Sequence, residues 1–120
     1  MWNGVSRRRF PRVSAPLLIN IYHNGHEESL TTKTESVGQG GLSAPIDQDL
    51  GLATLIHVKF ILPKTSKMIE CQGKVVWIIQ KRFSDNGVLQ MKFDTGIEFV
   101  NLKKEDKTLI EKLVGESDLF

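Results

Sequence analysis

Hydrophobic residues recur at every second position over most of the chain, which is the pattern of half-buried β-strands. The first such run places at alternate positions Leu17, Ile19 and Ile21. The dipeptide Asn24-Gly25 that follows favours a two-residue hairpin turn, because both residues tolerate the positive φ angles of that turn. The Thr-rich segment 30–37 is therefore predicted to be the return strand of a hairpin.

Longer strands are predicted in the second half of the chain. In the segment 54–62, one face carries Leu55, His57, Lys59 and Ile61, and the other carries Ile56, Val58, Phe60 and Leu62. Pro63 ends this strand, since proline has no N–H to donate. A second long strand is predicted over 68–81. The turn at 84–87 leads into a strand over 88–93, which residues 96–100 continue or follow with a bulge.

Helical spacing is present only near the end of the chain, over residues 103–114. One side of this helix would carry Leu109, Ile110, Leu113 and Val114, and the rest would carry Lys103, Lys104, Asp106, Lys107 and Lys112. Six or seven strands with one terminal helix predict a small antiparallel barrel or sandwich. No repeat, low-complexity tract or long linker divides the 120 residues, so we expect one domain.

The composition is that of an ordinary globular protein, with 40% apolar and 25% charged residues. Cys71 is the only cysteine, so no internal disulfide can form, and no Cys/His cluster has the spacing of a zinc site. The longest apolar run, 58–63, is far shorter than a membrane span of about 20 residues. Residues 1–13 also lack the apolar stretch of a signal peptide. We therefore expect a cytoplasmic protein without a metal or cofactor.

The net charge of +2 conceals an uneven distribution along the chain. Residues 1–13 have a charge of +4 and no acidic residue, because they contain Arg7, Arg8, Arg9 and Arg12. The other residues hold 12 Lys and Arg against 14 Asp and Glu, a net charge of −2. Arginine suits forked contacts with phosphates and guanine edges. On its own, such a cluster fits either a solvated tail or a flexible arm that binds anions. In both cases residues 1–13 would precede a folded domain over residues 14–115.

Catalytic chemistry finds little support in the sequence. His23, His26 and His57 form no HxH or HExxH pair, and no GxSxG or Walker A sequence occurs. The carboxylates at 27–28 and 47–49 lie in or beside predicted turns and are not paired for acid–base work. We therefore expect no enzymatic activity. His57 is expected to be a satisfied core or wall residue, and Trp77 is expected to pack in the barrel.

A glycine-rich corner at 37–41 follows the predicted return strand. It is not a dinucleotide-binding loop, because Pro45 comes soon afterwards and no helix begins there. Glycines in such a corner let backbone amides come close to a ligand and tolerate positive φ angles. A tight β-corner without a ligand explains the same glycines equally well.

Two short motifs in this order resemble those of the PilZ domain family. Arg8 and Arg12 form an R-x-x-x-R arm. The segment 36–41, Ser-Val-Gly-Gln-Gly-Gly, follows where the family has (D or N)-x-S-x-x-G. The segments 60–63, 73–77 and 95–99 are similar to the family's later strands. The resemblance covers nearly the whole chain and implies an all-β fold, a small six-stranded antiparallel Greek-key barrel with a C-terminal α-helix.

The family comprises bacterial receptors for cyclic di-GMP (c-di-GMP). The resemblance therefore implies this ligand, a downstream protein partner, and second-messenger signalling in motility or biofilm formation. The implied ligand-binding residues are Arg8, Arg12, Ser36, Gly38 and Gly41, with Arg7, Arg9 and Gly40 as secondary contacts. The arginines would clamp phosphate and guanine groups or stack on the bases. Ligand would order the arm over the glycine corner and change the surface shown to a partner.

Two positions depart from the family motif. Ser36 stands where the family has Asp or Asn, and Gly38 stands where it has Ser. A hydrogen bond contributes about 0.5–1.5 kcal/mol net, so these losses would weaken binding roughly 10- to 100-fold. The departures leave open a protein–protein adaptor of the same fold that no longer binds nucleotide. A small nucleic-acid-binding barrel is a further alternative, but no strand interleaves aromatic residues with Lys and Arg.

Overall fold

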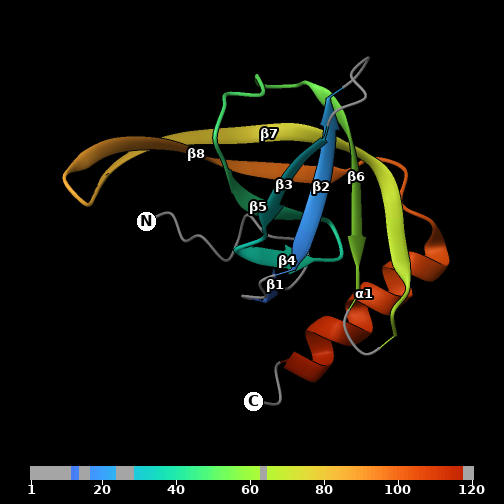
Figure 1. Cartoon of the computed structure of the whole chain (residues 1–120). Helices are drawn as coiled ribbons and strands as arrows, with labels where there is room; N and C mark the ends of the chain where they lie inside the picture. The colour runs from blue at the N-terminus through green and yellow to red at the C-terminus, as the bar shows by residue number, and fades with distance from the viewer. Residues whose placement is uncertain (1–11, 14–16, 24–28, 63–64, 118–120) are drawn as a thin grey trace, which may run out of the picture.

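The computed structural model describes residues 12–13, 17–23, 29–62 and 65–117. They form eight β-strands and one α-helix (Figure 1). The elements are β1 (Arg12–Val13), β2 (Leu18–His23), β3 (Ser29–Lys33), β4 (Ser36–Gly38), β5 (Gly41–Ile46), β6 (Leu55–Ile61), β7 (Met68–Asp85), β8 (Val88–Phe99) and α1 (Lys104–Ser117). Strands therefore dominate the fold, as the alternation of apolar and polar residues predicts.

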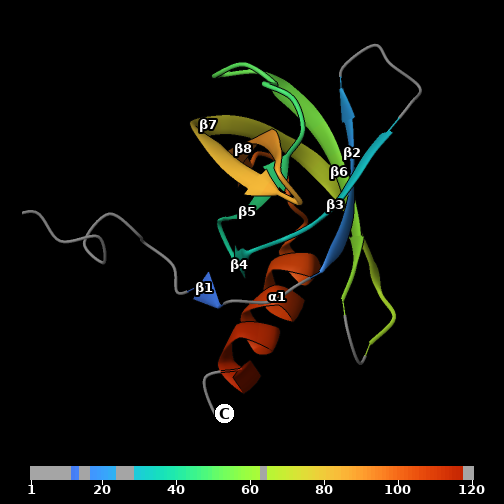
Figure 2. The ribbon, with the colours of Figure 1, turned by 60° about the vertical axis from the view of Figure 1, so that its left-hand side comes forward.

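The eight strands belong to one antiparallel sheet in the order β1-β4-β5-β8-β7-β6-β2-β3. The sheet is strongly curled (Figure 2), which brings β3 at one end of this order close to β5. The hydroxyl of Thr32 on β3 donates a hydrogen bond to the carbonyl of Pro45 on β5 at 2.7 Å. The predicted barrel-like, all-β fold with a C-terminal helix is confirmed.

The six strands that the family resemblance implies are too few, whereas the alternation allowed six or seven. Apart from the two-residue β1, seven strands are present among the described residues. The segment 30–37, predicted as one strand, forms parts of two, because the chain changes neighbours at Thr34 and Glu35. The Thr34 amide donates a hydrogen bond to the carbonyl of Leu17, just before β2. The Glu35 amide instead donates to the carbonyl of Ser43 on β5. β3 therefore pairs with β2, and β4 pairs with β5.

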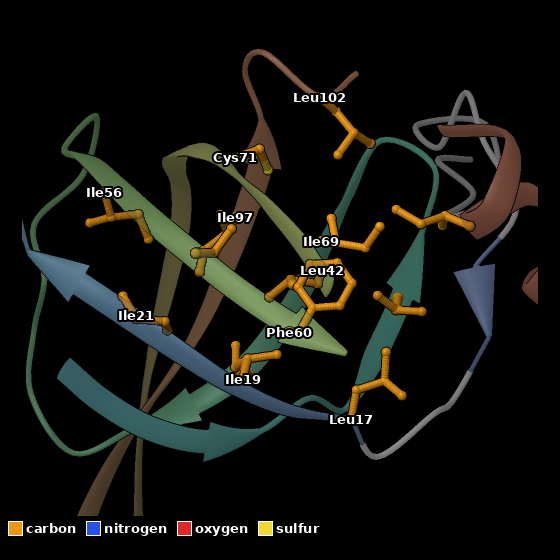
Figure 3. Packing of buried hydrophobic residues seen from close by; sticks show 14 of the residues in the cluster. Leu17, Ile19, Ile21, Leu42, Ile56, Phe60, Ile69, Cys71, Ile97 and Leu102 are labelled. Carbon is orange, nitrogen blue, oxygen red and sulfur yellow. The ribbon is translucent and has the colours of Figure 1, made fainter. Parts of the chain in front are cut away.

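The hydrophobic core lies on the concave side of the curled sheet (Figure 3). On β6, Ile56, Val58 and Phe60 are buried and His57 and Lys59 face outward, as the alternation predicts. The fully buried large side chains include Ile19, Ile21, Leu42, Ile69 and Ile97, which come from four different strands. Full burial of such a side chain contributes about 1.5–3 kcal/mol, so this core is the main source of stability.

β7 and β8 form a long hairpin that projects away from the barrel (Figure 1). Its turn lies at Asn86-Gly87, within the predicted turn, and both residues have positive φ angles, 53° and 78°. β8 is one continuous strand, and the irregularity predicted near its Gly96 lies instead on β7, between Val75 and Trp77. Neither β5 nor β6 accompanies the hairpin to its turn, so its distal part is a two-stranded ribbon.

α1 packs against the sheet near β4 and β1 (Figure 2). Its predicted apolar side is confirmed, since Ile110 and Val114 are buried in the core. Asp106, predicted on the solvated side, is buried at 3% exposure. Its Oδ1 atom has no hydrogen-bond partner among the described residues, and the Lys67 ammonium lies 4.0 Å away. This cation and the position in the first helical turn both favour a carboxylate at this site.

Candidate ligand-binding site

Strand pairing brings the first motif to the second. β1 lies antiparallel to β4, with Arg12 opposite Gly38 and Val13 opposite Val37. The backbone of the last arginine in the R-x-x-x-R arm is therefore adjacent to the second motif. The other arginines of the arm, Arg7, Arg8 and Arg9, lie outside the described residues, so their contacts stay predictions.

The second motif occupies β4 and its turn into β5. Val37 points into the core and is fully buried. Since successive side chains of a strand alternate, Ser36 and Gly38 belong to the opposite, outer face of the sheet. Ser36 Oγ lies 2.8 Å from Ser43 Oγ on β5, and one of the two hydroxyls donates to the other. Ser36 is half-buried and Ser43 is buried, so Ser36 is the more accessible hydroxyl of the pair.

The glycines of the corner are explained first by packing. A Cβ atom at Gly41 would lie 2.1 Å from the carbonyl oxygen of Ile97 on β8, which no side chain could tolerate. The φ angle of Gly41 is outside the left-handed region, so close approach rather than a positive φ requires glycine there. The Gly40 carbonyl accepts a hydrogen bond from the Phe99 amide at 2.9 Å. The corner is thereby fastened to β8, and ligand contacts of Gly40 and Gly41 stay predictions.

A row of residues on the outer face extends from the two serines to a tryptophan. Gly96 on β8 is the register partner of both Ser43 on β5 and Trp77 on β7. A Cβ atom at Gly96 would lie 2.1 Å from the indole nitrogen of Trp77, so the ring lies directly over the glycine. We call Ser36, Ser43, Gly96 and Trp77 the cross-strand row.

The expectation that Trp77 packs inside the barrel is wrong. The irregularity between Val75 and Trp77 adds one residue to β7, so Trp77 faces outward where a regular strand would turn it inward. Its side chain is 36% exposed. Sequence reasoning also missed Ser43, although the alternation within 41–46 was an available signal. The apolar residues on the core side of that segment are Leu42, Ala44 and Ile46.

A charge cluster borders the cross-strand row. Asp94 is 8% exposed, and the Lys81 ammonium lies 2.5 Å from its Oδ2 atom. Burial and a hydrogen bond with Asp94 raise the pKa of the Glu35 carboxyl. The hydrogen bond with Asp94 also raises the pKa of Lys81. Because Glu35 directly precedes Ser36, this charge cluster lies beside the second motif.

His57, one of the histidines considered for catalysis, lies on β6 and pairs with a carboxylate of β7. His57 Nε2 lies 2.7 Å from Glu70 Oε1, and its ring meets Tyr22 edge-on. His57 is thus a satisfied residue of the outer wall, as expected, and its hydrogen bond lowers the pKa of Glu70. In the part of the chain that the structure describes, no group of three or more His, Cys, Asp or Glu side chains could hold a metal ion. His26 and the carboxylates at 27–28 lie outside that part.

One further property concerns membranes. Among the described residues, no helix is both long and apolar enough to span a bilayer.

A comparison with known protein families identifies the family of this chain. The model of the PilZ domain matches residues 6–116, which include the whole R-x-x-x-R arm and all eight strands. The chain belongs to the PilZ domain family. No curated protein matches its sequence.

Solved structures share this PilZ fold at low sequence identity. The inhibitor of motility MotI/DgrA from Bacillus subtilis gives a TM-score of 0.76 at 20% identity, covering 94% of this chain and 52% of that chain. The PilZ domain of YcgR from Escherichia coli with c-di-GMP gives 0.74 at 13% identity, covering 94% and 92%. The complex of MrkH from K. pneumonia with c-di-GMP gives 0.74 at 17% identity, covering 94% and 53%. The chain thus spans about half the length of MotI and MrkH.

Proposed function

We propose that this PilZ domain binds c-di-GMP at the outer face formed by β1, β4 and β5, and that binding orders the arginine arm. The pairing of Arg12 with Gly38 carries this proposal, because it places the last arginine of the first motif beside the second motif. Two structures that share the fold, YcgR and MrkH, contain c-di-GMP, which supports the class of ligand. The protein would act in the cytoplasm as a signalling module, without a catalytic step.

The chemistry of the ligand suits the residues around this face. c-di-GMP carries two phosphates and two guanines, and the arginine fork binds a phosphate or the O6/N7 edge of guanine through paired N–H groups. Arg8 and Arg12 would supply these donors, while Arg7 and Arg9 would add positive potential. At the far end of the cross-strand row, the exposed indole of Trp77 offers a flat surface for a base.

The second motif retains part of its hydrogen-bonding capacity. The hydroxyls of Ser36 and Ser43 are bonded to each other at 2.8 Å, so the pair still has one proton to donate and lone pairs to accept. Gly38 contributes only its backbone. We therefore expect binding roughly 10- to 100-fold weaker than the same face would show with the family's Asp or Asn and Ser.

Binding would act on the arm through charge. The four arginines of residues 1–13 repel one another, and two ligand phosphates would offset that repulsion. The ligand would contact Arg8 and Arg12 only in the bound state. Binding would therefore stabilise the ordered arm relative to the free arm, as a switch requires. The ordered arm would then present a new surface beside β1 and β4 to a downstream protein in motility or biofilm signalling.

Calorimetric titration of c-di-GMP tests this proposal. We expect micromolar binding to the parent chain at about 150 mM salt. We expect at least a 100-fold loss in Arg8→Ala/Arg12→Ala, because two charged clamps are removed. Arg82→Ala is the matched control, since Arg82 lies on the distal ribbon of the hairpin and should leave the affinity unchanged. A double variant that binds as tightly as the parent would contradict the proposal.

The adaptor function is the second candidate, favoured by the loss of the family's side chains at Ser36 and Gly38. In that case the parent chain would give no heat with c-di-GMP. A protein partner would instead bind the chain equally well with and without nucleotide in a pull-down.

A further inference from the structure

The distal part of the β7–β8 hairpin leaves a strand edge unpaired. β5 accompanies β8 only from Phe93 to Glu98. Residues 88–92 of β8 therefore have β7 on one side and, within the described chain, no strand on the other. Figure 1 shows this ribbon projecting away from both the barrel and α1. A two-stranded hairpin is only marginally stable alone in water, and an open strand edge is a template for another strand.

The ribbon also carries exposed apolar side chains. Leu89 is 69% exposed, Val88 is 60% exposed and Met91 is 41% exposed. Leu89 and Met91 share the face that continues inward to Phe93 and the buried Thr95. The alternation that builds the core thus continues past the end of the barrel, onto side chains that are exposed.

The edge of β8 is self-complementary about Gln90. When two such edges pair antiparallel with Gln90 on the two-fold axis, Leu89 of each copy lies opposite Met91 of the other. The result is a cluster of four apolar side chains on one face of a four-stranded sheet. On the opposite face the two Gln90 amides meet, and each can donate to the carbonyl of the other.

The charges of the ribbon fit the same arrangement. Within the hairpin, Asp85 pairs with Val88 near the turn, and Lys81 pairs with Lys92 nearer the barrel. Two-fold pairing places Val88 of one copy opposite Lys92 of the other. Asp85, the partner of Val88 within the hairpin, then lies in line across the sheet with Lys92 and Lys81 of the second copy. Lys81 and Lys92 also bond carboxylates of their own chain, which holds both ammonium groups in position.

We propose that residues 88–92 of β8 bind the same edge of a second copy of this chain, forming an antiparallel dimer. The dimer does not require nucleotide. A five-residue edge is small beside the roughly 1,200–2,000 Å² of stable complexes. We therefore expect a weak dimer, with a dissociation constant on the order of 10–100 µM.

Sedimentation equilibrium of the full chain, from about 5 µM to about 1 mM, brackets that dissociation constant and tests the dimer. Leu89→Lys should raise the dissociation constant at least tenfold, because it places a charge in the apolar cluster. Leu52→Lys is the matched control, since Leu52 is 66% exposed but lies outside the ribbon, and it should have no effect. A chain that stays monomeric at every concentration would overturn the dimer, as would equal effects of the two substitutions.

Cysteine cross-linking tests the register. Directly opposite residues of an antiparallel pair have Cβ atoms about 4.5–5.5 Å apart, close enough for a disulfide after small adjustments. Gln90→Cys should therefore give a covalent dimer on mild oxidation, whereas Lys107→Cys, at an exposed position on α1, should not. The native Cys71 is buried and does not compete. Failure of Gln90→Cys to cross-link under conditions where the chain is dimeric would overturn the proposed pairing.

Discussion

Arg12 on β1 lies opposite Gly38 on β4, so a backbone ladder joins the end of the arginine arm to the second motif. In the chain these residues are separated by β2 and β3, which pair with each other and not with β1 or β4. The position where the arm ends is therefore set by the sheet. In the proposed complex, a ligand bound by Arg12 would lie beside β4.

Restoring the family's side chains should strengthen c-di-GMP binding. Ser36→Asp combined with Gly38→Ser adds a charged acceptor and a hydroxyl on the outer face of β4. We expect the affinity measured by calorimetry to rise roughly 10-fold or more. Ser29→Asp, which adds the same charge to β3, is the control and should have no such effect. Unchanged or weaker binding in the restored variant would show that the ligand does not contact β4.

Gly41→Ala should destabilise the fold. Its Cβ atom would lie 2.1 Å from the Ile97 carbonyl oxygen, and backbone cannot move aside as a flexible side chain can. We expect a loss of about 1–3 kcal/mol or more in the free energy of unfolding, measured with urea. Gly115→Ala is the control, because nothing lies within 4 Å of its added Cβ atom. That helical substitution should stabilise slightly, by about 0.5–1 kcal/mol.

Trp77 should report on ligand binding through its fluorescence. Its indole lies over Gly96, in the same row as Ser36, so a guanine bound near β4 and β5 would change its surroundings. A Trp2→Phe chain isolates this signal. We expect the emission to change along the same binding curve that calorimetry gives. A constant emission at saturating c-di-GMP would place the ligand away from Trp77.

Cys71 should be unreactive in the folded protein. Burial raises the pKa of its thiol to about 11, so almost none is thiolate at neutral pH. At pH 8, we expect the rate of reaction with a thiol reagent to be limited by the rate at which the chain unfolds. Because the folded pKa lies above the unfolded value of 9.0, stability should also fall as the pH rises from about 9 to about 11. Cys71→Ser should remove this alkaline loss, and rapid labelling of the native chain would contradict the buried thiol.

Alternation predicted those parts of the fold in which burial alone decides the structure. The two faces of β6 and the apolar side of α1 are correct, because each depends on which side chains leave water. The break at Thr34 and Glu35 was missed because it depends on a change of neighbouring strand. Asp106 was misplaced for a similar reason, since the cation that faces it comes from a distant turn.

The candidate site likewise contains residues that the sequence could predict and residues that it could not. Ser36 and Gly38 could be found from the motif, because both lie in one short segment of chain. Ser43 and Trp77 join them only through strand register, and the orientation of Trp77 depends on one extra residue in β7. A sequence pattern carries no record of such an insertion, because Val75, Val76 and Trp77 are all apolar.

Mapping the backbone amides by NMR during a c-di-GMP titration tests the central claim most directly. We expect the amides of Val13, Ser36 and Gly38 to shift with the ligand, because β1 and β4 form the proposed face. The amides of Asn20 and Lys59, on the distant strands β2 and β6, should stay in place. An unchanged spectrum at saturating c-di-GMP, or shifts confined to β2 and β6, would contradict the account.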